Sequence, residues 1–161
     1  MVLEANLPTL APHEDCWLVH NISRGVSMPG PDPTVQHGSA TVMVFTLPMD
    51  LRGWATFYEQ GCHAVTPMSR AVPSQSLDAR IKNRSRMSYT LAEFEAKLVD
   101  PAAQSVILDI HGNVAENKGG NVFLVADGVL MTPTVSNSLA GVSRETVLEL
   151  AQELGVSTCQ T

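Results

Sequence analysis

The stretch 107-ILDIHGNVAENKGGNVFLVADGVLMT-132 decides the fold, because it reads as two consecutive antiparallel hairpins. Apolar and β-branched runs alternate with short polar bends, and Asp127-Gly128 is a strong signal for a two-residue turn. Chain segments that return directly on each other pair in the antiparallel sense. The segments that we expect to be strands here are 105–110, 114–116, 121–125 and 129–131.

Two helices flank these hairpins. Met87, Leu91, Phe94 and Leu98 recur at helical spacing and predict a helix over 83–99, which Asp100-Pro101 ends. A second helix is expected to begin with Ser143 as its N-cap and to end at Gly155. The remaining expected elements are strands over 16–22, 40–47 and 63–66, a short helix over 54–58, and loops over 25–38 and 70–77. This order predicts an α+β fold with a largely antiparallel sheet and packed helices.

Composition excludes several classes of function. A net charge of −6 without a long basic run argues against binding to nucleic acid. The three cysteines are far apart and the five histidines lack metal-ligand spacing, so we expect neither a disulfide framework nor a metal site. With no long apolar stretch and no signal-peptide pattern, the sequence predicts a cytoplasmic protein without a membrane partner.

Lys82 lies where the Pro-containing loop meets the first long helix. A lysine at such a junction can direct its amine into a cleft, and a partly desolvated amine can form a Schiff base with a carbonyl. A lone lysine is far more often a solvated surface charge. The chemistry of this residue alone therefore leaves both interpretations open.

Two further features lie downstream of this lysine. Glu116 ends a strand before a Gly-rich bend, where a carboxylate can pair with the nitrogen of a pyridine ring, although it reads equally well as a surface residue. Val142 and Ser143 open the last helix, whose free N–H groups suit a phosphate, although an ordinary helix cap explains them as well.

Taken in order, these motifs resemble the class IV (fold type IV) pyridoxal-phosphate aminotransferases. That family includes branched-chain and D-amino-acid aminotransferases, (R)-selective amine transaminases and aminodeoxychorismate lyase. The resemblance is strongest over 80–155, from IKNRSR through LDIHGNVAE and GGNVF to GVSRETV. It implies the large domain of the fold type IV enzymes, with pyridoxal 5′-phosphate as cofactor, an amino donor and a 2-oxo acid as substrates, and a homodimer.

The resemblance also implies roles for individual residues. Lys82 would form the Schiff base and move the proton, and Glu116 would pair with the ring nitrogen. Asn121 would lie near the cofactor, and Val142 and Ser143 would hold the phosphate. Arg24 and Arg70 are candidates for the substrate side. Many members carry a tyrosine five residues after the lysine; here that position is Met87, and Tyr89 follows two residues later.

The resemblance further predicts a chain that is truncated at both ends relative to the family. Residues 1–20 would be a remnant of an N-terminal region or a linker, and residues 21–161 a partial cofactor-binding catalytic domain. Two alternatives to an aminotransferase remain open. One is a β-elimination lyase of the aminodeoxychorismate type, which uses the same lysine. The other is a non-catalytic remnant that dimerises or binds a ligand.

Overall fold

The computed structural model describes residues 1–12, 14–25 and 39–161, in two compact units, Met1–Gly61 and Cys62–Thr161. The sequence placed a boundary between residues 20 and 21, but this point lies inside strand β1 (Asp15–Ser23). Strand β1 pairs along its whole length, so its residues stay in one unit, and the chain divides after Gly61. The expected loop over 25–38 lies, except for Gly25, outside the described residues.

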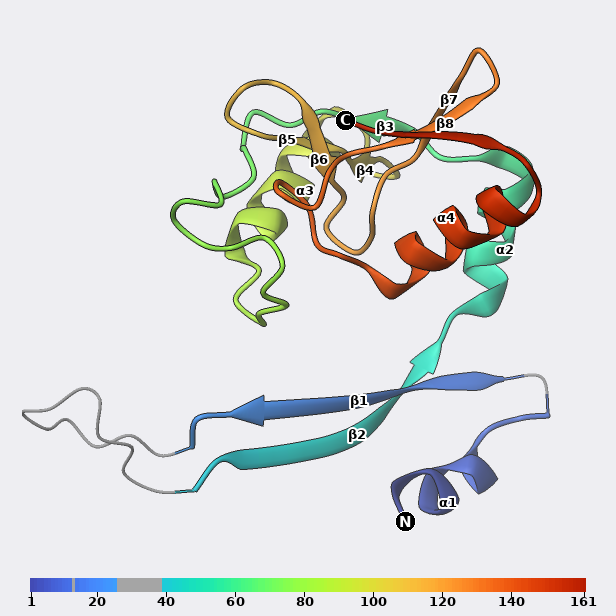
Figure 1. Cartoon of the computed structure of the whole chain (residues 1–161). Coiled ribbons are helices and arrows are strands. Elements are labelled where there is room, and N and C mark those ends of the chain that lie inside the picture. The colour runs from blue at the N-terminus through green and yellow to red at the C-terminus, as the bar shows by residue number, and fades with distance from the viewer. Residues whose placement is uncertain (13, 26–38) are drawn as a thin grey trace, which may run out of the picture. The chain divides into compact units, whose positions relative to one another are not determined.

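The first unit contains a long antiparallel pair of strands with helix α1 (Val2–Asn6) next to it (Figure 1). Strand β1 pairs with β2 (Thr41–Met49) in antiparallel register, from Asp15 opposite Met49 to Ser23 opposite Thr41. The ring centroids of Trp17 and Trp54 lie 5.8 Å apart, edge to face, and this pair brings helix α2 (Leu51–Gln60) into contact with β1. The strands expected over 16–22 and 40–47 are confirmed as β1 and β2. Helix α1 (Val2–Asn6) and the 3-10 turn η1 (Leu7–Thr9) were not expected.

The second unit contains the two predicted hairpins. Strand β5 (Ile107–Leu108) pairs with β6 (Val114–Glu116), and β7 (Leu124–Ala126) pairs with β8 (Val129–Thr132), both in antiparallel register. Asp127 and Gly128 both take positive φ, 50° and 76°, as a tight hairpin turn requires. The α+β fold with largely antiparallel pairing is therefore confirmed.

Two strand pairs in this unit are parallel. Strand β3 (Ala64–Val65) pairs with β4 (Gln104–Ser105), and β8 pairs with β9 (Ser157–Gln160), which the sequence did not predict. The prediction of a single strand over 105–110 is wrong. The segment splits because Ser105 pairs with β3, whereas Ile107 pairs with β6.

Both long helices begin at other residues than the sequence predicted. Helix α3 (Met87–Val99) starts four residues late, because Asn83 N–H donates to the Ile81 carbonyl in a tight turn. Helix α4 (Val142–Glu153) has Gly141, not Ser143, as its N-cap, since the Gly141 carbonyl accepts the first helical N–H, that of Glu145. Gly155, at φ 69°, follows the end of α4 as expected.

Small residues form the buried faces of these helices. Ala92 and Ala96 of α3 are fully buried, whereas the apolar face used to predict the helix, Met87, Leu91, Phe94 and Leu98, is exposed. Ala92 joins Ala71, Ile107 and Ala115 in the core of this unit, with Tyr89 packed against them. Short side chains let the α3 backbone approach the strands closely. Among the described residues, no helix is long and apolar enough to cross a membrane.

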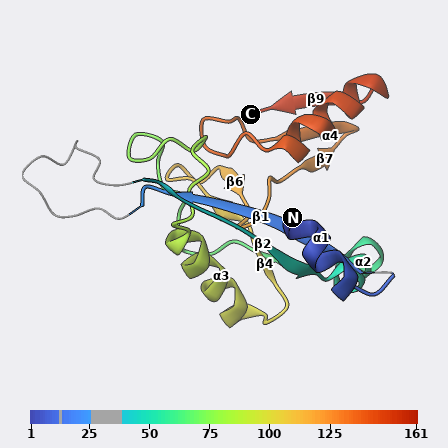
Figure 2. The same ribbon diagram turned by 90° about the horizontal axis from the view of Figure 1, so that it is seen from below.

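Arg144 of α4 is 2% exposed and joins three segments. Its guanidinium donates to the Pro133 carbonyl at 3.0 Å, beyond β8, and to Gln160 Oε1 at 2.7 Å, in β9. It also pairs with Glu145 at 2.6 Å. Helix α4 runs beside β9 in both views (Figure 2), so Arg144 fixes the helix against the parallel strand pair.

Arg144→Ala is expected to lower the free energy of unfolding of the second unit by about 3 kcal/mol, because two part-buried carbonyl acceptors lose a charged donor. Amide hydrogen exchange of α4 and β9 measures this loss. Tryptophan fluorescence serves as an internal control, since Trp17 and Trp54 both lie in the first unit. Arg80→Ala, at an exposed ion pair with Asp78, should leave the stability nearly unchanged, because solvent screens an exposed pair. Equal protection of α4 in Arg144→Ala and Arg80→Ala would contradict the assignment.

Candidate functional site

Glu116, at the end of β6, is 6% exposed and has two hydrogen-bond donors. The Tyr89 hydroxyl, from α3, donates to Oε1, and the Leu139 N–H donates to Oε2 at 3.1 Å. A buried carboxylate without donors would be costly, so these contacts fix its orientation. Glu116 is therefore not the surface residue that its local sequence allowed.

A tight turn connects Glu116 to Asn121. Asn117 N–H donates to the Gly120 carbonyl at 2.9 Å, and Glu116 and Asn121 form an antiparallel bridge across this turn. The Asn121 side chain then donates from Nδ2 to the Leu139 carbonyl at 2.7 Å. Both backbone polar groups of Leu139 are thus held: its N–H donates to Glu116, and its C=O accepts from Asn121.

Gly141 lies two residues after Leu139. A Cβ atom at position 141 would lie 2.1 Å from Asn121 Oδ1, so only glycine fits beside Asn121 without displacement. Glycine here lets the chain pass Asn121 closely and enter α4 one residue later. The first turn of α4, with Val142 and Ser143 exposed, has no side-chain cap, so its N–H groups remain available to an anion.

Asp109 secures the segment that carries Leu139. It is 5% exposed and accepts the backbone N–H groups of His111 and Asn113 at 2.8 and 2.9 Å. Asn137 also donates to Asp109 Oδ2, at 3.0 Å. Burial alone would raise the pKa of Asp109, but hydrogen bonds from Asn113 and His111 outweigh it and hold that pKa below its ordinary value. The ionised carboxylate thus anchors the approach to Leu139.

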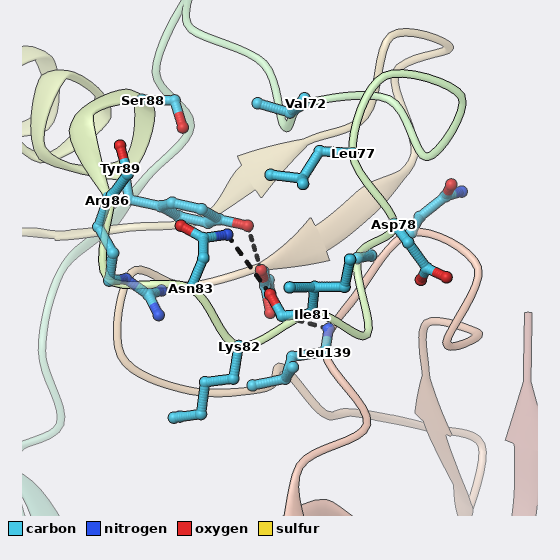
Figure 3. Close-up of a pocket in the computed structure, with 14 residues that line it drawn as sticks. Val72, Leu77, Asp78, Ile81, Lys82, Asn83, Arg86, Ser88, Tyr89 and Leu139 are labelled. Carbon is cyan, nitrogen blue, oxygen red and sulfur yellow. Dashed lines mark hydrogen bonds between the residues drawn. The ribbon is translucent and has the colours of Figure 1, made fainter. Parts of the chain in front are cut away.

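Lys82 and Glu116 line the same pocket, together with Tyr89, Asn137 and Leu139 (Figure 3). Lys82 is exposed, and its side chain extends away from the Tyr89 ring. It lies in a local turn held by Ile81 N–H on the Asp78 carbonyl, five residues before α3, and not at the helix start that the sequence predicted. Because the four-carbon side chain of lysine is flexible, the Lys82 amine can turn from solvent into the pocket.

The other predicted site residues are placed differently. Val142 and Ser143 do not line this pocket, but they follow Leu139 along the chain after Ala140 and Gly141. Arg70 does not line it either, and its guanidinium donates to the carbonyls of Pro67 and Met68. Arg24 belongs to the first unit. Among the described residues, no group of acidic, histidine or cysteine side chains is arranged to hold a metal ion.

The sequence identified neither Leu139 nor the Asp109–Asn137 pair as part of this site, and it gave Tyr89 no role. A signal for Tyr89 exists in the helix pattern. Tyr89 precedes the buried Ala92 and Ala96 by three and seven residues, which places all three on one face of α3. A face of small residues indicates where another backbone approaches closely. The Leu139 contacts use backbone atoms, so the amino-acid sequence carries no pattern that would reveal them.

The chain resembles known proteins along nearly its whole length. Residues 5–161 match the family described as Amino-transferase class IV. A Methanocaldococcus jannaschii protein, provisionally named a branched-chain-amino-acid aminotransferase, is 32% identical over 148 residues, 91% of this chain and 49% of its own length. The branched-chain-amino-acid aminotransferase of Escherichia coli K12 is 33% identical over 73% of this chain and 38% of its own length.

Solved structures agree with these matches. The Escherichia coli branched-chain aminotransferase structure has a TM-score of 0.75 at 27% identity, over 85% of this chain and 45% of that one. A branched-chain aminotransferase from T.th., solved with pyridoxamine 5′-phosphate, reaches 0.79 at 24% identity, over 99% and 50% of the two chains, and shows likeness of fold. The present chain spans half or less of the length of each of these relatives.

Gly141→Ala is expected to destabilise the second unit by about 1–3 kcal/mol, because the added Cβ overlaps Asn121. The same change in an Asn121→Ala background should cost less than about 1 kcal/mol, since the overlapping atom is gone. Urea unfolding of the four proteins of this double-mutant cycle measures the coupling. Additive effects of the two changes would contradict the contact.

Proposed function

Because the chain belongs to the class IV amino-transferases, we propose that it transfers an amino group from an amino acid or amine to a 2-oxo acid, with pyridoxal 5′-phosphate as cofactor. One observation carries the proposal: Lys82 and the buried, doubly hydrogen-bonded Glu116 line a single pocket. An amine and a fixed carboxylate are the two groups that this cofactor requires from a protein. Branched-chain amino acids are the first donors to test, given the names of the relatives.

The chemistry of several described residues suits this cofactor. Glu116 is fixed in orientation, the pocket beside it is lined by Leu139, and two lining residues carry buried polar atoms without a partner, Asn83 Oδ1 and Arg86 Nε. When bound, the cofactor supplies an aldehyde for the lysine and a ring that accepts electrons. Glu116 would hold the proton on the ring nitrogen. The exposed Lys82 would turn its amine into the pocket and carry a proton to and from the substrate.

The phosphate and the substrate would use the neighbouring segments. The uncapped first turn of α4 would bind the phosphate through the N–H groups of Val142 and Ser143 and the Ser143 hydroxyl. Asn121 would support the phosphate site indirectly, because it holds the Leu139–Gly141 segment that leads into α4. Arg24 and Arg70 remain candidates for the substrate carboxylate, with Arg70 having to release the carbonyls that it now binds.

Three further parts of the proposal rest on the family. Residues 62–161 would form the cofactor-binding unit, since they contain every proposed cofactor contact. A cytoplasmic homodimer would be the working form. Transfer is favoured over β-elimination because the relatives are named as aminotransferases, and analysis of products from an amino donor separates the two reactions.

Borohydride reduction of the chain with pyridoxal 5′-phosphate should place the pyridoxyl group on Lys82. The competing lysines, Lys97 and Lys118, are both engaged in ion pairs with Glu93 and should remain unlabelled. Peptide mapping by mass spectrometry measures the position of the label. The same treatment of Lys82→Ala is the control, and a label on Lys97 or Lys118 in the parent chain would remove Lys82 from the mechanism.

Glu116→Gln should slow amino transfer by roughly a hundredfold or more, the scale expected when a preorganised charge-stabilising group is removed. Cofactor affinity should fall by less than about tenfold, because the amide keeps the shape and one acceptor. Glu149→Gln, an exposed position of α4, is the matched control. Stopped-flow absorbance and a cofactor titration separate the two effects, and an unchanged transfer rate would exclude Glu116 from the chemistry.

A further inference from the structure

Tyr89 contacts the proposed ring-nitrogen acid. Its hydroxyl donates to Glu116 Oε1, while the Leu139 N–H occupies Oε2. A carboxylate offers about four acceptor positions, so two donors leave room for a third, the protonated ring nitrogen. Without Tyr89, Glu116 would keep one donor and would be free to turn about that single contact.

Arg86 holds Tyr89 in this position. Its guanidinium lies 4.6 Å from the centroid of the Tyr89 ring, within the range of a cation–π contact. The same guanidinium donates to the Lys118 carbonyl, in the turn that follows Glu116. The first turn of α3 and its N-cap Arg86, four residues after Lys82, therefore contact both the carboxylate of Glu116 and the turn beyond it.

We propose that Tyr89 is a positioning residue that keeps the Glu116 carboxylate directed toward the ring nitrogen of the cofactor. This inference rests on the proposed function. Tyr89 acts through Glu116 and makes no contact of its own with the reacting atoms. Its role is distinct from the family position five residues after the lysine, which Met87 occupies here.

The ionisation of Tyr89 agrees with this role. Burial first, and then the hydrogen bond and negative charge of Glu116, raise the pKa of Tyr89 above its ordinary value, whereas Arg86 lowers it. A raised pKa keeps the hydroxyl protonated through the neutral and mildly alkaline range. Tyr89 therefore remains a donor to Glu116 at every pH where amino transfer would be measured.

A first experiment tests the contact without cofactor. Tyr58 is the other tyrosine, 93% exposed and in the first unit, so Tyr58→Phe leaves Tyr89 as the sole tyrosine. In this background, tyrosinate absorbance should appear well above pH 10, the ordinary value being about 10. Adding Glu116→Gln should move the transition to lower pH, with circular dichroism showing that the chain stays folded. A Tyr89 that titrates alike in both proteins would overturn the proposal.

A second experiment uses pyridoxal 5′-phosphate labelled with ¹⁵N in its ring. Tyr89→Phe keeps the ring and its packing but removes the donor, so the ring-nitrogen resonance should shift toward the unprotonated position. The kcat for amino transfer should fall by about tenfold with an unchanged KM for the donor, because one hydrogen bond to the acid is lost. An unchanged ¹⁵N resonance would reduce Tyr89 to a packing role and overturn the inference.

The two experiments separate this inference from the proposed function. If the parent chain binds no pyridoxal 5′-phosphate at millimolar concentration, the proposed function fails, while the tyrosine titration still decides whether Tyr89 orients Glu116. If the cofactor binds and Tyr89→Phe behaves as the parent does, the function stands and the positioning role is rejected. Tyr58→Phe alone should reproduce the parent chain in both measurements.

Discussion

A buried carboxylate must meet hydrogen-bond donors, and this requirement at Glu116 organises the second unit. One donor comes from α3 through Tyr89, and the other comes from the segment before α4 through Leu139. Glu116 itself ends β6, so the hairpin, the first long helix and the approach to the second are joined at one acidic group. Leaving that carboxylate unpaired would cost several kcal/mol, more than most single packing contacts contribute.

The Leu139 backbone carries this constraint to the start of α4. Its N–H is used by Glu116, and its C=O by Asn121, so the position of the acid and the direction of the chain into α4 are not independent. Asp109 and Asn137 hold the preceding residues. Arg144 then ties the helix to the strands on its other side. The proposed ring and phosphate contacts are therefore joined by one continuous set of hydrogen bonds.

Local sequence pattern predicted the hairpins well, because Asp127-Gly128 and the β-branched runs specify pairing between near neighbours. It failed where the partner is remote. Strand β9 pairs in parallel with β8 after a whole helix, and the segment expected as one strand over 105–110 divides between two partners. For the site, the family resemblance pointed to Lys82 and Glu116, which line one pocket. The contacts that orient Glu116 involve a backbone N–H and a helix face of small residues, neither of which stands out as a pattern of residue types.

The close contact between Gly141 and Asn121 also has a consequence for how this sequence can diverge. With only 2.1 Å between a Cβ at position 141 and the Asn121 amide oxygen, position 141 cannot gain a side chain while Asn121 keeps its present place. A side chain at 141 requires Asn121 to be shortened or displaced, and either change disturbs its donation to the Leu139 carbonyl. The two positions should therefore covary among related sequences, although twenty residues separate them in the chain.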